Sequence, residues 1–381
     1  LLSRMDRVAE APETEYANGK GYVPKWQNHW VSDPDTESKL EEMAEILEMQ
    51  HELQEGCMLL KGHAGTGKDV LVKMFCERAK RPYFAIDCTK WTTEYELGED
   101  ITLESKDGAS QTVKVPSVVL QAITTPGAVM YFNEFNAMNE QAQIFLHALM
   151  DEKRSITLKT SSGKTIKADP DVLLIASMNP NYPGTFAPQF ATRSRMVSVD
   201  VDYPSLLVKP KEGDTNLHPC YNVSEPLRIA RSVASLADFT IEGNMERNEF
   251  VKIWNKYINH ADNDAPPITP TQQFDLEVIL ALVQFGDKLR TDFIKIFEKT
   301  EDSVDALPVT QPITLREMRR CAYFLSKMSD AEKLAGSADP DEVARNLLAK
   351  FFLTHIDKRT DRDVIQTSMT GNWHSQKRLA A

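Results

Sequence analysis

The chain has 381 residues, which is more than one compact domain usually holds, so we expect two structural units. Hydrophobic residues make up 41% and charged residues 26%, as in an ordinary globular protein and unlike a disordered one. Lys and Arg number 44 against 56 Asp and Glu, a formal net charge of −12. This charge argues against a surface that coats nucleic acid or an anionic membrane.

The sequence favours a cytoplasmic protein. No apolar run approaches the roughly 18 residues that a bilayer span needs, so we expect no membrane association. The chain begins at Leu1 without a signal-peptide pattern, which we interpret as a trimmed N-terminus of an intracellular protein. The five cysteines lie far apart without CxxC spacing, and Cys57, Cys76 and Cys88 fall in apolar stretches, so we expect reduced core thiols.

The first elements are an irregular arm over residues 1–36 and an amphipathic helix over 38–54. The arm's one aromatic cluster, within 21–30, is interpreted mainly as cover for the edge of the chain's own domain. Packing beside a bound base or on a neighbouring subunit remains open for it.

A glycine-rich loop follows the first apolar strand, Cys57 to Leu60, and precedes an apolar-periodic helix that begins at Asp69. The pattern GxxxxGK over 62–68 in this setting is typical of a phosphate-binding loop, because glycines let backbone amides curl around phosphates. Lys68 adds a mobile positive charge and the helix N-terminus its dipole. The predicted nucleotide-binding residues are Gly62, His63, Ala64, Gly65, Thr66, Gly67, Lys68, Asp69 and Val70.

Asp69 departs from the Ser or Thr that normally follows the lysine and ligates Mg²⁺. A carboxylate is a good ligand for Mg²⁺, so metal binding survives. Its negative charge beside the phosphates is unfavourable unless the metal neutralises it, which affects nucleotide affinity or rate.

Two segments alternate apolar and polar residues around turn signals and predict β-hairpins, over 101–115 and 155–167. The second is locally basic, with five cations and no acid between Lys153 and Lys167. Two interpretations stay open: a solvated edge guarded by lysines, or a surface that grips an acidic polypeptide or a nucleic-acid backbone. The five cations are Lys153, Arg154, Lys159, Lys164 and Lys167.

A second acidic site lies between these hairpins, where a buried-strand pattern from residue 128 ends in Asn133-Glu134. P-loop ATPases usually carry Asp-Glu here, the Asp holding hydrated Mg²⁺ and the Glu orienting the attacking water. Glu134 is the candidate water activator. Asn133 and Asp69 are the candidate metal residues, and we hypothesise that Asp69 restores the charge that Asn133 lacks.

Two later motifs complete the candidate site. A strand over 171–177 leads to Asn179, whose amide can reach the γ-phosphate or the attacking water. Arg193 and Arg195 precede the next strand. They are interpreted either as solvated helix ends or as a cation donated across a subunit boundary to a phosphoryl group.

The order of these motifs resembles the AAA+ ATPases, and more closely the branch with MoxR-type, dynein-related and cobaltochelatase-small-subunit-like members. The specific likeness covers roughly residues 38–205 and continues more weakly to about 366. It implies an α/β fold: a P-loop AAA+ core with a parallel sheet and two β-hairpin insertions, followed by a small helical lid domain. It also implies ATP and Mg²⁺ as cofactors, Asn179 as the first sensor, Arg193 or Arg195 as an arginine finger, and Arg316 as the second sensor.

The resemblance also sets the expected domains. They are the arm 1–36, the nucleotide-binding domain 37–205, a linker 206–225, a helical lid 226–366 and a tail 367–381. In the lid, helices are predicted over 226–239, 274–285, 314–328 and 340–354, while residues 242–270 receive no assigned role.

For function, the resemblance implies an ATP hydrolase in a homo-oligomeric ring, expected to be a hexamer, that remodels or activates a partner protein in a chaperone-like way. A separate protein with a von Willebrand factor A domain is an expected partner. Two alternatives stay open: a nucleic-acid motor of the McrB type acting through the hairpin Lys153–Lys167, and a nucleotide-gated structural ring. Asp69 and Asn133 motivate the latter, because they put the hydrolysis rate in doubt.

Overall fold

A computed structural model describes ten segments of the chain. They are residues 22–25, 34–106, 109–160, 163–180, 184–208, 220–240, 248–261, 264–298, 306–336 and 338–371. These segments form two compact units. The first is built from residues up to 63 and from 67–202, and the second from residues 64–66 and from 203 onward.

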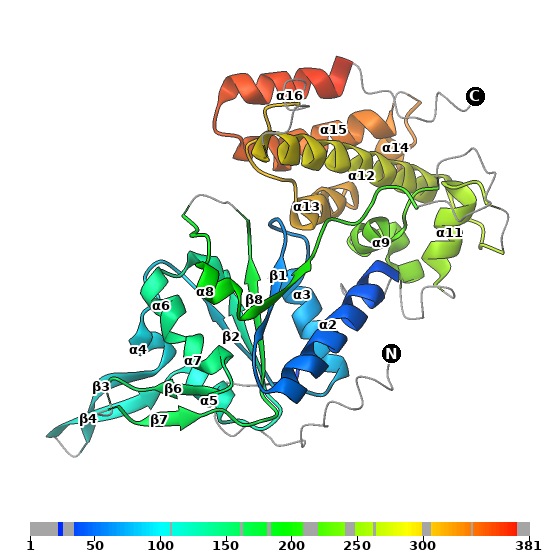
Figure 1. Cartoon of the computed structure of the whole chain (residues 1–381). Coiled ribbons are helices and arrows are strands. Elements are labelled where there is room, and N and C mark those ends of the chain that lie inside the picture. The colour runs from blue at the N-terminus through cyan, green and yellow to red at the C-terminus, as the bar shows by residue number, and fades with distance from the viewer. Residues whose placement is uncertain are drawn as a thin grey trace. The chain divides into compact units, whose positions relative to one another are not determined.

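The first unit is organised by a five-stranded parallel sheet with the strand order β2-β5-β8-β1-β9 (Figure 1). Its strands are β1 (Cys57–Lys61), β2 (Tyr83–Asp87), β5 (Val129–Asn133), β8 (Leu173–Met178) and β9 (Met196–Asp200). The three central strands are buried almost throughout, as parallel strands covered on both faces must be. The predicted α/β fold class is therefore confirmed.

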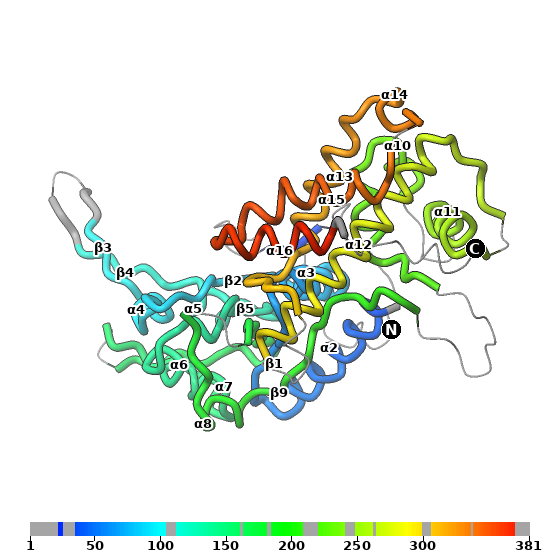
Figure 2. The backbone as a smooth tube through the Cα atoms, turned by 90° about the horizontal axis from the view of Figure 1, so that it is seen from above, coloured from blue at the N-terminus to red at the C-terminus, as the bar shows by residue number. Residues whose placement is uncertain are grey.

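Helices cover both faces of this sheet. In Figures 1 and 2, α2 (Pro34–Leu53) and α3 (Lys68–Arg78) lie on one side. On the other side lie α5 (Val118–Ile123), α6 (Glu140–Phe145) and α7 (His147–Met150). The short helices α4 (Glu94–Leu97), η1 (Phe135–Ala137) and α8 (Phe190–Arg193) complete the unit. Cys57, Cys76 and Cys88 are buried in it, as predicted.

Both predicted hairpins are present in the first unit. β3 (Glu99–Lys106) pairs with β4 (Ala109–Pro116), and β6 (Ser155–Thr157) pairs with β7 (Thr165–Lys167), each antiparallel. The Asp107-Gly108 turn lies outside the described residues. Figure 2 shows β3 and β4 extending away from the sheet.

The arm contributes one described contact to this unit. Tyr22 forms an antiparallel bridge with Tyr83, and the Tyr83 amide donates to the Tyr22 carbonyl at 2.8 Å. Because β2 is an edge strand, this contact covers the domain's own edge. The remainder of the aromatic cluster, residues 26–30, lies outside the described residues.

The second unit is helical. Its elements are α9 (Ser224–Ala230), α10 (Ala234–Ala237), η2 (Asp238–Thr240), α11 (Glu249–Tyr257), α12 (Pro270–Phe297), α13 (Leu315–Leu325), α14 (Asp330–Lys333), α15 (Pro340–Phe351), η5 (Leu353–His355) and α16 (Arg359–Gly371). The main helix of the unit is α12, which has 28 residues and packs against α15 and α9. A capping box between Thr269 and Gln272 fixes its start.

The predicted helices of this unit lie at the positions of observed helices, but their lengths differ. The stretch 226–239 is divided among α9, α10 and η2, and α12 is far longer than the predicted 274–285. Sequence reasoning missed α11, whose Phe250 and Trp254 are fully buried. α16 continues to Gly371, inside the range expected as a tail, so the domain boundaries stay predictions. Among the described helices, none is long and apolar enough to cross a membrane.

Candidate nucleotide-binding site

The strand order brings the sequence motifs together at one edge of the sheet. β8 lies between β1 and β5 and pairs with both in parallel, so the carboxyl ends of all three strands meet. The glycine loop follows β1, Asn133 and Glu134 end and follow β5, and Asn179 follows β8. In open α/β sheets, ligands bind at this end of the strands.

The glycine loop has a backbone that favours glycine at two positions. Gly65 has φ +80° and Gly67 has φ +94°, both left-handed conformations that L side chains rarely adopt. Gly67 is also the N-cap of α3, so the loop passes directly into the helix N-terminus. Of the other predicted loop residues, Gly62, His63 and Thr66 are buried, whereas Ala64 and Val70 are half-buried.

Lys68 is buried, and its ammonium is held by acceptors from the loop and from β8. Its Nζ donates to the carbonyls of Gly62 at 2.8 Å and His63 at 2.9 Å, and to Asn179 Oδ1 at 2.9 Å. Burial lowers the pKa of this ammonium to about 8, against an opposing effect of Glu134. A buried cation on three acceptors at a helix N-terminus is suited to phosphate.

Asn179 links Lys68 to Glu134. Its Nδ2 lies 3.5 Å from Glu134 Oε1, while its Oδ1 accepts from Lys68. Glu134 has φ +53°, a left-handed conformation, and its amide donates to Ser177 Oγ at 3.2 Å. The structure thus brings together three predicted site residues from three separate motifs.

Asn133 is bonded to a carboxylate that sequence reasoning missed. Its Nδ2 donates to Asp87 Oδ1 at 2.8 Å, and its Oδ1 accepts from Ser177 Oγ at 3.0 Å. Tyr131 donates to Ser177 at 2.9 Å and completes the network. Asp87 ends β2 as Asn133 ends β5, and the two are paired in register. The sequence feature that could have identified Asp87 is an acidic residue at the end of the apolar run 83–87.

Asp69 makes other contacts. Its Oδ2 lies 2.8 Å from Lys73 Nζ, and its Oδ1 accepts from Tyr83 at 3.2 Å. The carboxylate bonded directly to Asn133 is therefore Asp87, and the hypothesis that Asp69 restores the charge that Asn133 lacks stays a prediction. Burial, and then Asp69, raise the pKa of the Tyr83 hydroxyl, so it remains a proton donor.

The two candidate arginine fingers differ in their surroundings. Arg195 is held by Asp151, with Nε at 2.5 Å from Oδ1 and Nη2 at 3.2 Å from Oδ2. Arg193 is exposed and lies at the end of α8, without an ion pair to any described residue. Arg316 lies in the helical unit, exposed in the first turn of α13, and its role as a sensor stays a prediction.

The basic hairpin is less basic at its surface than the sequence predicts. Arg154 is only 2% exposed and its Nη2 donates to the carbonyl of Val172, so it belongs to the core. Lys159 pairs with Glu94 at 2.5 Å. Lys159 is exposed as well, and the three other exposed cations between 153 and 167 are Lys153, Lys164 and Lys167. Of the five cations counted in the sequence, Arg154 therefore adds no charge to the surface of the hairpin.

Comparisons with known proteins agree with this core. Residues 57–196 match the family model of the AAA domain, dynein-related subfamily. An uncharacterized protein of Staphylococcus aureus (strain USA300) is 31% identical over 147 residues, and one of Staphylococcus epidermidis is 29% identical over the same length. Each match covers 38% of this chain and 55% of the relative, so the chain spans about half the length of these curated relatives.

A solved structure of a proposed ATPase from Cytophaga hutchinsonii is 15% identical with a TM-score of 0.34, over 87% of this chain and 84% of that one. The family match covers the glycine loop and the strands β1, β2, β5 and β8 of the parallel sheet.

Proposed function

We propose that the chain binds ATP with Mg²⁺ at the loop 62–70 and hydrolyses it. The observation that carries this proposal is that Asn179 lies within hydrogen-bond reach of both Lys68 and Glu134. A phosphate-binding cation, a carboxylate able to orient water and a polar sensor are the parts that phosphoryl transfer requires.

The residues present fit ATP and Mg²⁺. Gly65 and Gly67 give the loop the left-handed turns by which it curves into α3, and Lys68 supplies the charge. Among the described residues no group of three or more His, Cys, Asp or Glu forms a metal site. This suits Mg²⁺, which keeps waters and binds through one or two carboxylates together with nucleotide phosphates. Asp69, Asn133 and Asp87 are the oxygen donors that would hold it.

In this mechanism each side chain has a separate task. Glu134 orients and polarises a water for attack on the γ-phosphoryl group, with its backbone held by Ser177. Lys68 stays protonated near neutral pH and balances phosphate charge. Asn179 touches both residues, so it transmits the state of the phosphate to the carboxylate.

We further propose that the chain works as a homo-oligomeric ring, with a hexamer as the expected form. An exposed cation at Arg193 is suited to reach a neighbouring subunit's phosphate, whereas Arg195 first has to leave Asp151. Arg316 is the corresponding candidate from the helical unit. The cargo of the ring would be a protein client, in a MoxR-like, chaperone-like role with a separate partner such as a von Willebrand factor A domain protein.

Two other functions are distinguished by specific observations. Exposed Lys153, Lys164 and Lys167 favour a nucleic-acid motor, although the inward Arg154 and paired Lys159 weaken it. Asn133 in place of an acid favours a slowly hydrolysing structural ring, although Asp87 supplies a neighbouring carboxylate.

Phosphate release by the full chain tests these functions. The proposal expects Mg²⁺-dependent release from ATP that single-stranded DNA leaves unchanged at both 50 and 200 mM salt. Stimulation by DNA that collapses at the higher salt concentration would instead support the motor. ATP binding without release would support the structural ring.

A further inference from the structure

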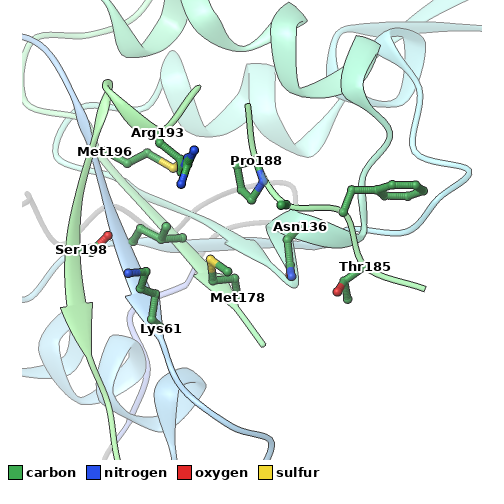
Figure 3. A pocket seen from close by; sticks show the side chains of 11 residues that line it. Lys61, Asn136, Met178, Thr185, Pro188, Arg193, Met196 and Ser198 are labelled. Atoms are coloured by element: carbon green, nitrogen blue, oxygen red, sulfur yellow. The ribbon is translucent and has the colours of Figure 1, made fainter. Parts of the chain in front are cut away.

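A cavity of about 270 Å³ lies in the first unit, on the face of the sheet opposite α3 (Figure 3). It lies under the segment 185–193, and strands β1, β8 and β9 form its floor. The apolar part of that floor comes from Leu59, Met178 and Met196. None of the residues 62–70, Glu134 and Asn133 lines it, so it is separate from the nucleotide loop, although the candidate arginine finger Arg193 is part of its lining.

The cavity contains a buried acceptor that lacks a donor. Asn136 is 1% exposed, and its Nδ2 donates to the Asn179 carbonyl at 2.8 Å. Its Oδ1 is buried and receives no hydrogen bond from any described residue. Turning the amide over would bring two carbonyl oxygens together, so the orientation is fixed by Asn179. A buried orphan acceptor that lines a cavity points to a ligand that carries an N–H or O–H group.

The charged residues that line the cavity indicate which group the other end of such a ligand carries. Lys61 and Arg193 both line it, and neither forms an ion pair with a described acid. Among the described residues, none that lines the cavity is a carboxylate. Figure 3 shows the Lys61 amine on the side of Ser198 and the Arg193 guanidinium beside Met196, at separate points of the rim. Two cations over an apolar floor favour an organic anion with an apolar body.

We propose that this cavity binds a compact amphipathic organic anion, which donates a hydrogen bond to Asn136 and places its anionic group at Lys61. The volume suits a ligand of about the size of a single aromatic ring with short substituents. Asn136 is bonded to the residue that holds Lys68, so the bound anion also changes the affinity of the nucleotide loop. This second consequence rests on the proposed function, whereas binding of the anion does not.

The test uses 4-hydroxyphenylacetate as the probe, with two matched controls. Phenylacetate lacks the donor, and 4-hydroxyphenylacetamide lacks the charge. The full chain carries ¹³C-methyl methionine, and the signals of Met178 and Met196 are assigned by Met→Leu variants. We expect these two signals to shift on titration, with a Kd in the range of about 1–10 mM for so small a ligand. Each control is expected to bind at least about fivefold more weakly.

A variant pair locates the anionic contact. Lys61→Met is expected to weaken the probe at least fivefold, whereas Lys153→Met, an exposed lysine on the hairpin, leaves it unchanged. Unmoved Met178 and Met196 signals, equal binding of all three compounds, or a Lys61→Met protein that binds as the parent would each overturn the proposal. The methionine readout uses the unmodified lining, so it holds even if Lys61→Met does not fold.

The nucleotide consequence is measured separately, as the Kd of ATP with and without saturating probe. We expect a change of at least threefold, and an unchanged Kd would overturn the coupling. A protein that binds the probe but not ATP would contradict the proposed function while leaving the anion site established.

Discussion

The Lys68 ammonium donates to Asn179 Oδ1 at 2.9 Å, across 111 positions of sequence. The same asparagine approaches Glu134 at 3.5 Å through its other amide atom. The lysine proposed to bind phosphate and the carboxylate proposed to orient water are thereby coupled through a single side chain. A ligand that draws Lys68 away from Asn179 therefore changes the hydrogen bonds of Asn179, which also contacts Glu134.

Replacing Lys68 by Met is expected to abolish measurable ATP binding. Loss of a buried charge contact typically costs roughly 2–5 kcal/mol, which corresponds to a loss of affinity of about 30-fold or more. Isothermal titration with ATP and Mg²⁺ checks this, with Lys153→Met as the matched control on an exposed lysine. Equal affinity in the two variants would show that the loop is not the nucleotide site.

The pH dependence of ATP affinity is expected to follow Lys68. Its pKa of about 8 means that the ammonium is mostly charged at pH 7 and is lost as the pH rises through 8, so the Kd should increase there. Glu134 raises that pKa, so in Glu134→Gln the increase should begin at lower pH. Lys68→Arg stays protonated and should flatten the profile. A parent profile that is flat from pH 7 to 9.5 would contradict this assignment.

Glu134→Gln is expected to retain ATP binding at pH 7 within about threefold and to reduce hydrolysis by about 100-fold or more, as for loss of a general base. Single-turnover measurements separate the two effects. The exposed acid Glu152, replaced by Gln, provides the control. Hydrolysis that persists in Glu134→Gln would assign the water-orienting role to another residue, with Asp87 the first to examine.

Asn133 and Asp87 are joined by a hydrogen bond of 2.8 Å, and Asn133→Asp would replace it with two neighbouring carboxylates. We expect this variant to be less stable in EDTA and to gain at least 2 °C more in Tm from Mg²⁺ than the parent protein does, because a cation relieves the repulsion. Thermal unfolding with and without Mg²⁺ checks it. The double variant Asn133→Asp, Asp87→Asn should lose the extra gain.

In the helical unit, Arg290 and Glu225 form a buried bidentate pair at 2.6 and 2.9 Å, each at most 6% exposed. Burial lowers the pKa of Arg290, but Glu225 more than offsets it, so the pKa is raised and the pair is charged. Glu225→Ala should destabilise the unit by about 3–5 kcal/mol, because it leaves a buried cation. Denaturant unfolding checks this, and the double variant Glu225→Leu, Arg290→Met should recover most of the loss.

The sequence identified what is local in the chain. The loop 62–68 and Glu134 were found because a strand, a motif and a helix follow one another without a gap. The two hairpins were found because alternation and turn signals lie within about fifteen residues. These features need no knowledge of which strands are neighbours.

The features that the sequence did not predict depend on contacts between residues far apart in the chain. Asp87 matters because β2 lies beside β5, 46 positions away, and Asp151 holds Arg195 across 44 positions. The Arg154 guanidinium is held in the core by the carbonyl of Val172, 18 positions further along the chain. The helix α11 was missed within a range that received no assigned role, although its buried Phe250, Ile253 and Trp254 follow helical spacing.

The most direct test of the account is steady-state phosphate release across a protein concentration series, with Arg193→Ala and Glu134→Gln measured alone and mixed. The account predicts that specific activity rises with concentration, that each variant alone is inactive, and that the mixture regains part of the activity. Recovery is expected because some interfaces then combine an intact Arg193 with an intact Glu134. Specific activity independent of concentration, with no recovery on mixing, would contradict a shared site.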